Sequence, residues 1–173
     1  MTNAETSHAD VDTAYHEAGH AVMGCVLGRF PVSVTIVRNG PVAGKTDFEP
    51  DVPSFARGHF NVSPQRRVYA EQRVMGELAG SIAHDLFKPG RTPDRADEVD
   101  LYWARELIID LVSWQDREEY LNQARAKAKR LIEENWQWVD AVARALCQRK
   151  TLLREDILAL QPASVEYDDP HGA

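Results

Sequence analysis

Residues 14–22 read Ala-Tyr-His-Glu-Ala-Gly-His-Ala-Val, which contains the pattern H-E-x-x-H as His16, Glu17 and His20. On a helix, residues four apart lie on one face, so both imidazoles can bind the same ion. Zinc accepts neutral imidazole nitrogens at about 2.0–2.1 Å in a tetrahedral arrangement. Glu17 can take a proton from a zinc-activated water and pass it to a leaving amine. The pattern therefore predicts a hydrolytic zinc site.

The segment around this pattern predicts a buried helix. It should begin near Asp12 or Thr13, both good N-caps, and end near Leu27, because Gly28 can close it. A helix that is apolar on nearly every side is buried. The three polar residues of the pattern would be costly there without a partner such as a metal ion. The apolar positions are Ala14, Tyr15, Ala18, Ala21, Val22, Cys25, Val26 and Leu27.

A hydrolytic zinc site needs a third protein ligand and an open position for water. Residue type alone leaves several candidates in this chain. Four are histidines and four are carboxylates of one short segment: His8, His59, His84, His171, Asp94, Asp97, Glu98 and Asp100.

Helical periodicity favours Asp100 as the third ligand. It shares a helix face with the apolar residues four, seven and eleven positions later, so we expect it to point inward. Asp97 lies on the same face one turn earlier and is the second choice. Negative charge at a helix N-terminus is favourable in itself, and this accounts for Asp94, Asp97 and Glu98 without a metal.

The rest of the chain predicts a mostly α-helical α+β domain with a small antiparallel sheet. β-branched residues at 32–37 and the Asn39-Gly40 turn indicate a strand that returns over 42–48. Residues 49–63 should form a loop. Apolar periodicity predicts the remaining helices over 64–87, 94–113, 116–147 with a break near Asn135, and 154–160.

The domain organisation that we expect is one folded unit between two disordered ends. The chain has 173 residues, 43% of them hydrophobic, which is enough for a single core. The folded unit should cover residues 12–161, divided into a metal-site part at 12–115 and a C-terminal helical part at 116–161. The ends at 1–11 and 162–173 are polar.

Composition argues against several classes of protein. The net charge is -7 and the sequence lacks a long basic stripe, so we expect no nucleic-acid partner. A membrane span would need about 18 apolar residues in a row, and we expect no membrane contact. Cys25 and Cys147 lie far apart, which is typical of a reducing compartment. With a polar N-terminus that is unlike a signal peptide, these features predict a cytoplasmic protein.

Several segments of the sequence resemble the FtsH-type peptidase domain, the proteolytic half of the AAA+ membrane proteases. The resemblance extends over residues 12–160. Its most specific parts are the H-E-x-x-H segment and Asp100-Leu101-Tyr102-Trp103-Ala104, which is similar to the Asp-Leu-x-x-Ala segment of that family. Supporting similarities are Val34-Thr35-Ile36 with Gly44-Lys45-Thr46, Leu78-Ala79-Gly80-Ser81-Ile82-Ala83, and the run from Leu131 to Leu160.

This resemblance implies a zincin-like site with Zn²⁺ held by His16, His20 and Asp100, and with Glu17 as the base. It also suggests that the strand near 32–37 holds an extended substrate by β-augmentation. We therefore expect a metallopeptidase that acts on flexible or unfolded polypeptides.

FtsH-type proteases also carry a membrane anchor and an ATPase module, and the sequence shows neither. The run Gly40-Pro41-Val42-Ala43-Gly44-Lys45-Thr46 imitates a phosphate loop but is one residue short of the motif. We expect cleavage without ATP in this chain, with a separate unfoldase or adaptor as a possible partner. FtsH-type domains form hexameric rings, but the oligomeric state here stays open.

Two departures from the family pattern leave alternatives open. His84 stands where the family usually has a glutamate, and residues 96–99 replace the usual Thr-Gly-Ala-x-Asn before the third ligand. These differences could change the groups that orient the ligands. One alternative is a catalytically silent binding or regulatory module with the same fold. Another is a zinc amidase that acts on a small substrate, because fold and metal do not fix the substrate.

Overall fold

The computed structural model describes residues 7–49, 64–109 and 111–163, apart from the side chain of Arg66. The predicted loop after residue 49 and most of both predicted disordered ends lie outside the described residues. Helix α1 spans His8–Val26 and thus begins four residues before the expected start at Asp12. Ser7 caps it, because its hydroxyl accepts from the backbone N–H of Asp10 while the Asp10 carboxylate accepts from the backbone of Ser7. Residues 8–11, which we expected to be disordered, are therefore helical.

A three-stranded antiparallel sheet packs against α1. Strands β1 (Pro31–Thr35), β2 (Lys45–Phe48) and β3 (Thr151–Leu153) follow the order β2-β1-β3. Val34 of β1 lies opposite Thr46 on one side and Leu152 on the other. The predicted hairpin is confirmed, but β3 was not predicted. Because β1 is paired on both sides, it has no free edge for the β-augmentation that the resemblance suggested.

The connection between β1 and β2 is a hairpin turn. The backbone groups of Asn39 and Val42 exchange two hydrogen bonds, of 2.9 and 3.1 Å, and Gly40 has a φ of +59°, which favours glycine. A phosphate loop instead joins a strand to a helix. The structure thus supports the interpretation that the Gly-rich run does not bind phosphate.

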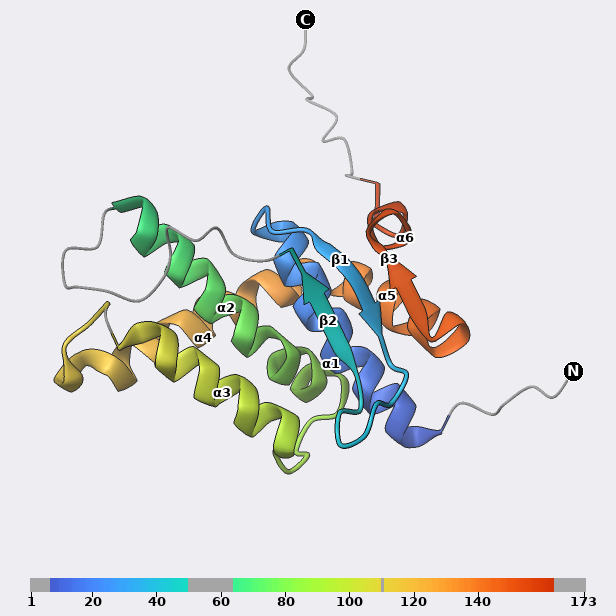
Figure 1. Cartoon of the computed structure of the whole chain (residues 1–173), viewed down its shortest axis with the longest axis horizontal. Helices are drawn as coiled ribbons and strands as arrows, with labels where there is room; N and C mark the ends of the chain where they lie inside the picture. The colour runs from blue at the N-terminus through green and yellow to red at the C-terminus, as the bar shows by residue number, and fades with distance from the viewer. Residues whose placement is uncertain (1–6, 50–63, 110, 164–173) are drawn as a thin grey trace, which may run out of the picture.

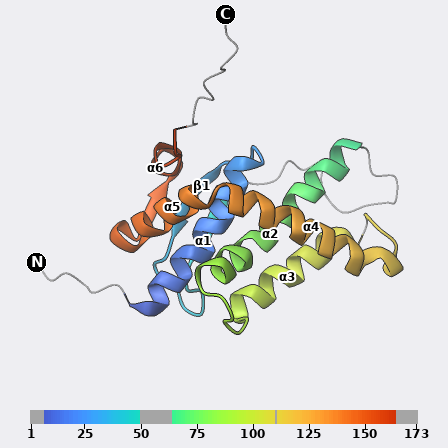
Figure 2. The same ribbon diagram turned by 180° about the vertical axis from the view of Figure 1, so that it is seen from behind.

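Helix α1 is the central element of the fold (Figures 1 and 2). It contacts α2 (Pro64–Phe87), α5 (Trp136–Arg149), and the sheet through β1 and β2. Gly19 makes the α1–α2 packing possible. A Cβ at that position would lie 2.6 Å from both the backbone oxygen of Ala79 and the Cβ of Ala83. Helices α1 and α2 are therefore packed almost backbone to backbone.

Helices α4 (Arg117–Glu134) and α5 pack behind α1 and α2, as Figure 2 shows, with α4 mainly against α2 and α5 against α1. Helix α3 (Arg95–Ile108) packs against α2. The predicted break near Asn135 is confirmed, whereas α3 ends five residues before the expected Ser113. Tyr15 of α1 stacks on Phe87 and donates to the Asp140 carboxylate at 2.5 Å, which ties α1 to α2 and α5. The other helical elements of the described residues are the 3-10 turn η2 (Trp114–Asp116) and α6 (Arg154–Ala159), and α6 contacts β1 and β3.

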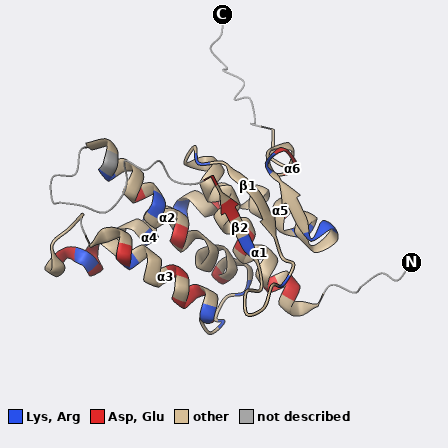
Figure 3. Ribbon diagram, viewed as in Figure 1, with Lys and Arg blue, Asp and Glu red and all other residues tan. Residues whose placement is uncertain are grey.

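Basic and acidic residues are intermixed over the helices in Figure 3. On α4, for example, Arg130 pairs with Glu134 one turn later. Within the described part of the chain, no helix is both long and apolar enough to cross a membrane.

Candidate metal centre and its cleft

Three of the predicted ligand side chains meet at one point. His16 Nε2 lies 3.0 Å and His20 Nε2 lies 3.1 Å from Asp100 Oδ2, and the two Nε2 atoms are 3.1 Å apart. Ligands around a tetrahedral zinc ion are about 3.3–3.4 Å apart, given bonds of about 2.0–2.1 Å. A small outward movement would therefore fit this donor set to the ion. The convergence agrees with the sequence analysis, while the ligand roles stay a prediction.

The charges at this point favour a cation. Burial alone lowers the pKa of His20, but the charge and the hydrogen bond of Asp100 outweigh it and raise that pKa above its ordinary value. Burial likewise raises the pKa of Asp100, and the two imidazoles overcome this and hold it well below its usual range. Without an ion, the Asp100 carboxylate stabilises a proton on His20. A divalent cation can take the place of this proton.

Helix α2 fixes His20 from behind and leaves room for the site. His20 Nδ1 lies 2.8 Å from the backbone oxygen of Gly76, so Nδ1 carries a proton that it donates there, and Nε2, which faces Asp100, is the nitrogen available to an ion. One turn later, Gly80 has no side chain where a Cβ would lie 2.3 Å from His20 Nε2 and 2.7 Å from His16 Nε2. The two imidazoles can converge only because this position is a glycine.

Glu17 is nearly buried, with 7% of its surface exposed, and strand β2 orients it. Thr46 donates a 2.7 Å hydrogen bond to Glu17 Oε2, and its hydroxyl also lies 3.2 Å from the backbone oxygen of Glu17. Sequence reasoning missed this role for Thr46. Thr46 was noted only as part of a strand and of the phosphate-loop-like run, because a contact across 29 residues leaves no local pattern.

A cleft of about 880 Å³ opens over these residues. Helix α1 supplies the floor with the two histidines and Glu17, and α3 supplies Asp100. Strand β2 forms one wall and α2 the other. The wall residues include Lys45, Thr46, Phe48, Gln72, Arg73 and Glu77.

No family model matches the chain. The chain is 28% identical over 184 residues to the ATP-dependent zinc metalloprotease FtsH 4 of Sorangium cellulosum (strain So ce56). That alignment covers 86% of this chain and 28% of the relative. The chain is 30% identical over 184 residues to the ATP-dependent zinc metalloprotease FtsH of Synechococcus sp. (strain JA-2-3B'a(2-13)), and the alignment covers 85% of this chain and 28% of the relative. For the ATP-dependent zinc metalloprotease FtsH of Haemophilus influenzae (strain ATCC 51907 / DSM 11121 / KW20 / Rd), the identity is 27% over 180 residues, and the alignment covers 90% of this chain and 27% of the relative.

The chain carries an FtsH-type peptidase domain. The three alignments cover between 85% and 90% of this chain. The mostly helical fold with a small antiparallel sheet confirms the predicted fold class. The chain spans little more than a quarter of the length of these relatives.

The other candidate ligands of this FtsH-type domain lie outside the convergence point. His8 is exposed at the start of α1, and Asp94 caps α3, with its side chain accepting from the backbone N–H groups of Ala96 and Asp97. His59 and His171 are outside the described residues. The interpretation of Asp94 as a favourable charge at a helix N-terminus is confirmed.

A second group of ligand-type side chains lies next to the first. His16, His84 and Asp97 are all buried, and their ligand-type atoms lie within 4.8 Å of one another. This group does not suit a cation, because the Arg91 guanidinium already donates to both oxygens of Asp97, at 2.6 and 2.8 Å. The positive charge of Arg91 would also repel a metal ion.

Proposed function

We propose that this domain is a zinc-dependent endopeptidase in which His16, His20 and Asp100 hold the zinc ion and Glu17 is the general base. The observation that carries the proposal is the meeting of three ligand atoms beside a buried glutamate in an open cleft. Two imidazoles and one carboxylate are the donor set of many catalytic zinc sites.

Zinc, when bound, polarises the scissile carbonyl and makes water a stronger acid. The protein supplies the proton transfers. Glu17 accepts a proton from the attacking water and returns it to the leaving amide nitrogen. Thr46 holds one carboxylate oxygen of Glu17, and the proposed proton transfers use the other oxygen.

The substrate that fits the cleft is an extended polypeptide. In the described sheet, β2 is an edge strand and lines the cleft, whereas β1 is paired on both sides. A peptide can therefore add to β2 through main-chain hydrogen bonds, which gives affinity with little sequence selectivity. A folded protein has few free backbone groups to offer, so flexible or unfolded segments are the proposed substrates.

Folded substrates would have to be unfolded first. The relatives are ATP-dependent proteases by name. We include in the proposal that an ATPase, in a separate protein or elsewhere in the same polypeptide, supplies such segments, and that the peptide-bond hydrolysis itself needs no ATP.

Removal and return of the metal tests this function. The zinc-loaded protein is incubated with a diverse library of unstructured peptides, and products are identified by mass spectrometry. We expect cleavage that stops after chelation and returns with stoichiometric zinc, without ATP. Tight zinc binding with no cleavage of any peptide would contradict the proposal and support the silent-module alternative. Cleavage confined to small amides would support the amidase alternative.

Thr46→Val is expected to lower kcat for peptide cleavage roughly tenfold, because Glu17 loses the hydrogen bond that orients its carboxylate. Zinc affinity should not change, since Thr46 is not among the converging ligand atoms. Steady-state kinetics on a peptide from the library measures the effect. Thr46→Ser keeps the hydroxyl and serves as the matched control. Equal rates for both variants would mean that Thr46 has no part in orienting the base.

A further inference from the structure

The Nδ1 atom of His16 is a buried polar atom that lacks a hydrogen-bond partner among the described residues. Nε2 of His16 faces the convergence point, while Nδ1 faces the interior. A neutral imidazole that binds a metal through Nε2 must carry its proton on Nδ1. Metal-binding histidines almost always donate this proton to a carboxylate, a carbonyl or water. The group beside Nδ1 therefore decides how well His16 can bind a metal.

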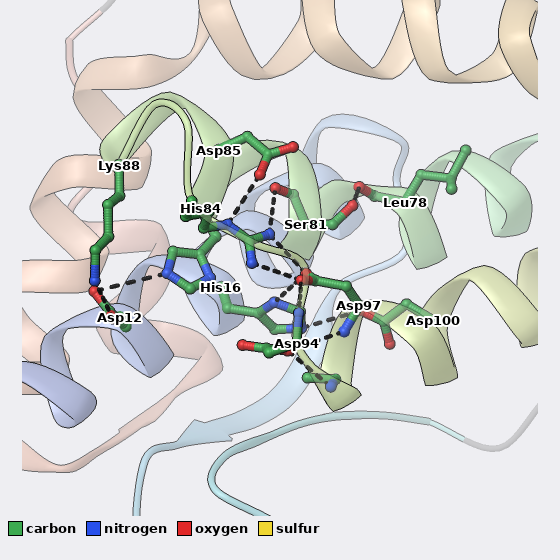
Figure 4. A network of polar contacts seen from close by, with 12 residues as sticks. Asp12, His16, Leu78, Ser81, His84, Asp85, Lys88, Asp94, Asp97 and Asp100 are labelled. Carbon is green, nitrogen blue, oxygen red and sulfur yellow. Dashed lines mark hydrogen bonds and ion pairs between the residues drawn. The ribbon is translucent and has the colours of Figure 1, made fainter.

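Asp97 is the nearest carboxylate to this nitrogen. Its Oδ1 lies 3.7 Å from His16 Nδ1, and its side chain is only 7% exposed. A typical hydrogen bond between nitrogen and oxygen is about 2.9–3.0 Å long, so a shift of less than about 1 Å closes the contact. Figure 4 shows Asp97 on α3 directed toward His16 on α1.

Arg91 holds Asp97 in this direction. Its Nη2 donates to Asp97 Oδ1 at 2.8 Å and its Nη1 donates to Oδ2 at 2.6 Å, a bidentate pair that fixes the plane of the carboxylate. The backbone N–H of Asp94 donates to Oδ2 at 2.7 Å. Arg91 is itself fixed, because its Nε lies 2.9 Å from Asp85 Oδ1. Such a network holds a side chain more rigidly than helix capping alone requires.

His84 is the competing partner for His16 Nδ1. It is buried, and neither of its ring nitrogens has a hydrogen-bond partner among the described residues. Its Nε2 lies 3.6 Å from Asp12 Oδ1, on a different element from Asp97. An ionised carboxylate is a stronger acceptor than a neutral imidazole, which favours Asp97.

We propose that Asp97, clamped by Arg91, is a positioning residue that accepts the Nδ1–H of His16 and so fixes the tautomer and orientation in which His16 binds the metal. The inference rests on the proposed zinc site and adds two residues to it. Asp97 thus has a role beyond its favourable charge at the N-terminus of α3. Asp97 and the two residues that it joins come from three segments of the chain: α1, the loop before α3, and the first turn of α3.

Zinc affinity of the folded full chain tests the proposal. The dissociation constant is measured by competition with a chromophoric chelator, and Co²⁺ absorption reports the geometry of the bound ion. Asp97→Asn should weaken zinc binding by about 10–100-fold and change the Co²⁺ spectrum. Asp85→Asn is the matched control, because it removes a carboxylate from the same Arg91 but on the half-exposed side. The control should bind zinc as the wild type does.

Two results would overturn the proposal. One is an Asp97→Asn protein that is folded and binds zinc with wild-type affinity. The other is weakened binding in His84→Leu with no effect in Asp97→Asn, which would make His84 the partner. A wild-type protein that binds no zinc would instead overturn the proposed function, so the two failures are distinguishable.

A second variant covers the case in which Asp97→Asn does not fold because Arg91 is left buried without its partner. Arg91→Met combined with Asp97→Leu replaces the buried ion pair by apolar groups, a change that is often tolerated. We expect this variant to lose zinc affinity to the same extent as predicted for Asp97→Asn. Wild-type affinity in the folded double variant would contradict the proposal.

Discussion

Glu17→Gln should lower the rate of peptide cleavage by about 10²–10⁴-fold and leave zinc bound. Glutamine has nearly the same shape as glutamate but cannot accept the proton of the attacking water. Its amide oxygen can still accept the hydrogen bond from Thr46, so the local structure should persist. The measurement is kcat on a library-derived peptide, with zinc content determined on the same sample.

A control for this variant is Glu71→Gln. Glu71 also lies on a helix and pairs with Lys127 of α4, and it is not among the residues that line the cleft. Its rate should equal that of the wild type. Undiminished cleavage by Glu17→Gln would rule out Glu17 as the base and, with it, the proposed reaction path.

Gly80→Ala should abolish tight metal binding, with zinc affinity lowered by more than about 100-fold, beyond the range typical of disturbed ligand orientation. The added Cβ would lie 2.3 Å from His20 Nε2 and 2.7 Å from His16 Nε2, closer than atoms can approach. At least one imidazole must swing away, and the convergence with Asp100 is then lost. Isothermal titration with zinc measures the loss.

Gly76→Ala is the matched control for the Gly80 variant. It makes the same substitution one turn earlier on α2, where a Cβ would meet nothing within 4 Å. The backbone oxygen that faces His20 is retained, and the helix gains about 1 kcal/mol of intrinsic propensity. We expect Gly76→Ala to bind zinc normally and to unfold at a higher temperature. Equal zinc affinity in both variants would show that the metal does not lie between the imidazoles.

The convergence of His16, His20 and Asp100 could be predicted because the position of each side chain follows from a short-range sequence pattern. The spacing of His16 and His20 places them on one helix face, and the apolar residues that follow Asp100 at helical intervals turn it inward. Neither statement needs knowledge of the tertiary structure. The helices and the first hairpin were predicted on the same basis.

Features that depend on contacts between distant segments could not be predicted. Strand β3 is three residues long and exists because it pairs with β1, more than 100 residues earlier. Without β3, the sequence analysis placed β-augmentation by a substrate on β1, a strand that the sheet pairs on both sides. The contacts of Thr46 with Glu17 and of Asp97 with His16 have the same origin.

The early start of α1 differs from these cases, because a local signal for it was present. Ser7 and Asp10 form a capping pair with the spacing of a helix N-terminus. The polar character of residues 1–11 obscured this signal. Short polar segments next to a strongly apolar helix can extend it when such a cap is available.

Anomalous X-ray diffraction at the zinc absorption edge, from crystals of the zinc-loaded protein, tests the central claim most directly. The predicted result is one strong peak about 2.0–2.1 Å from His16 Nε2 and His20 Nε2, and about 2.0–2.2 Å from an Asp100 carboxylate oxygen. Glu17 should lie beside the peak without binding it. A peak at any other set of side chains, or none at saturating zinc, would contradict the account.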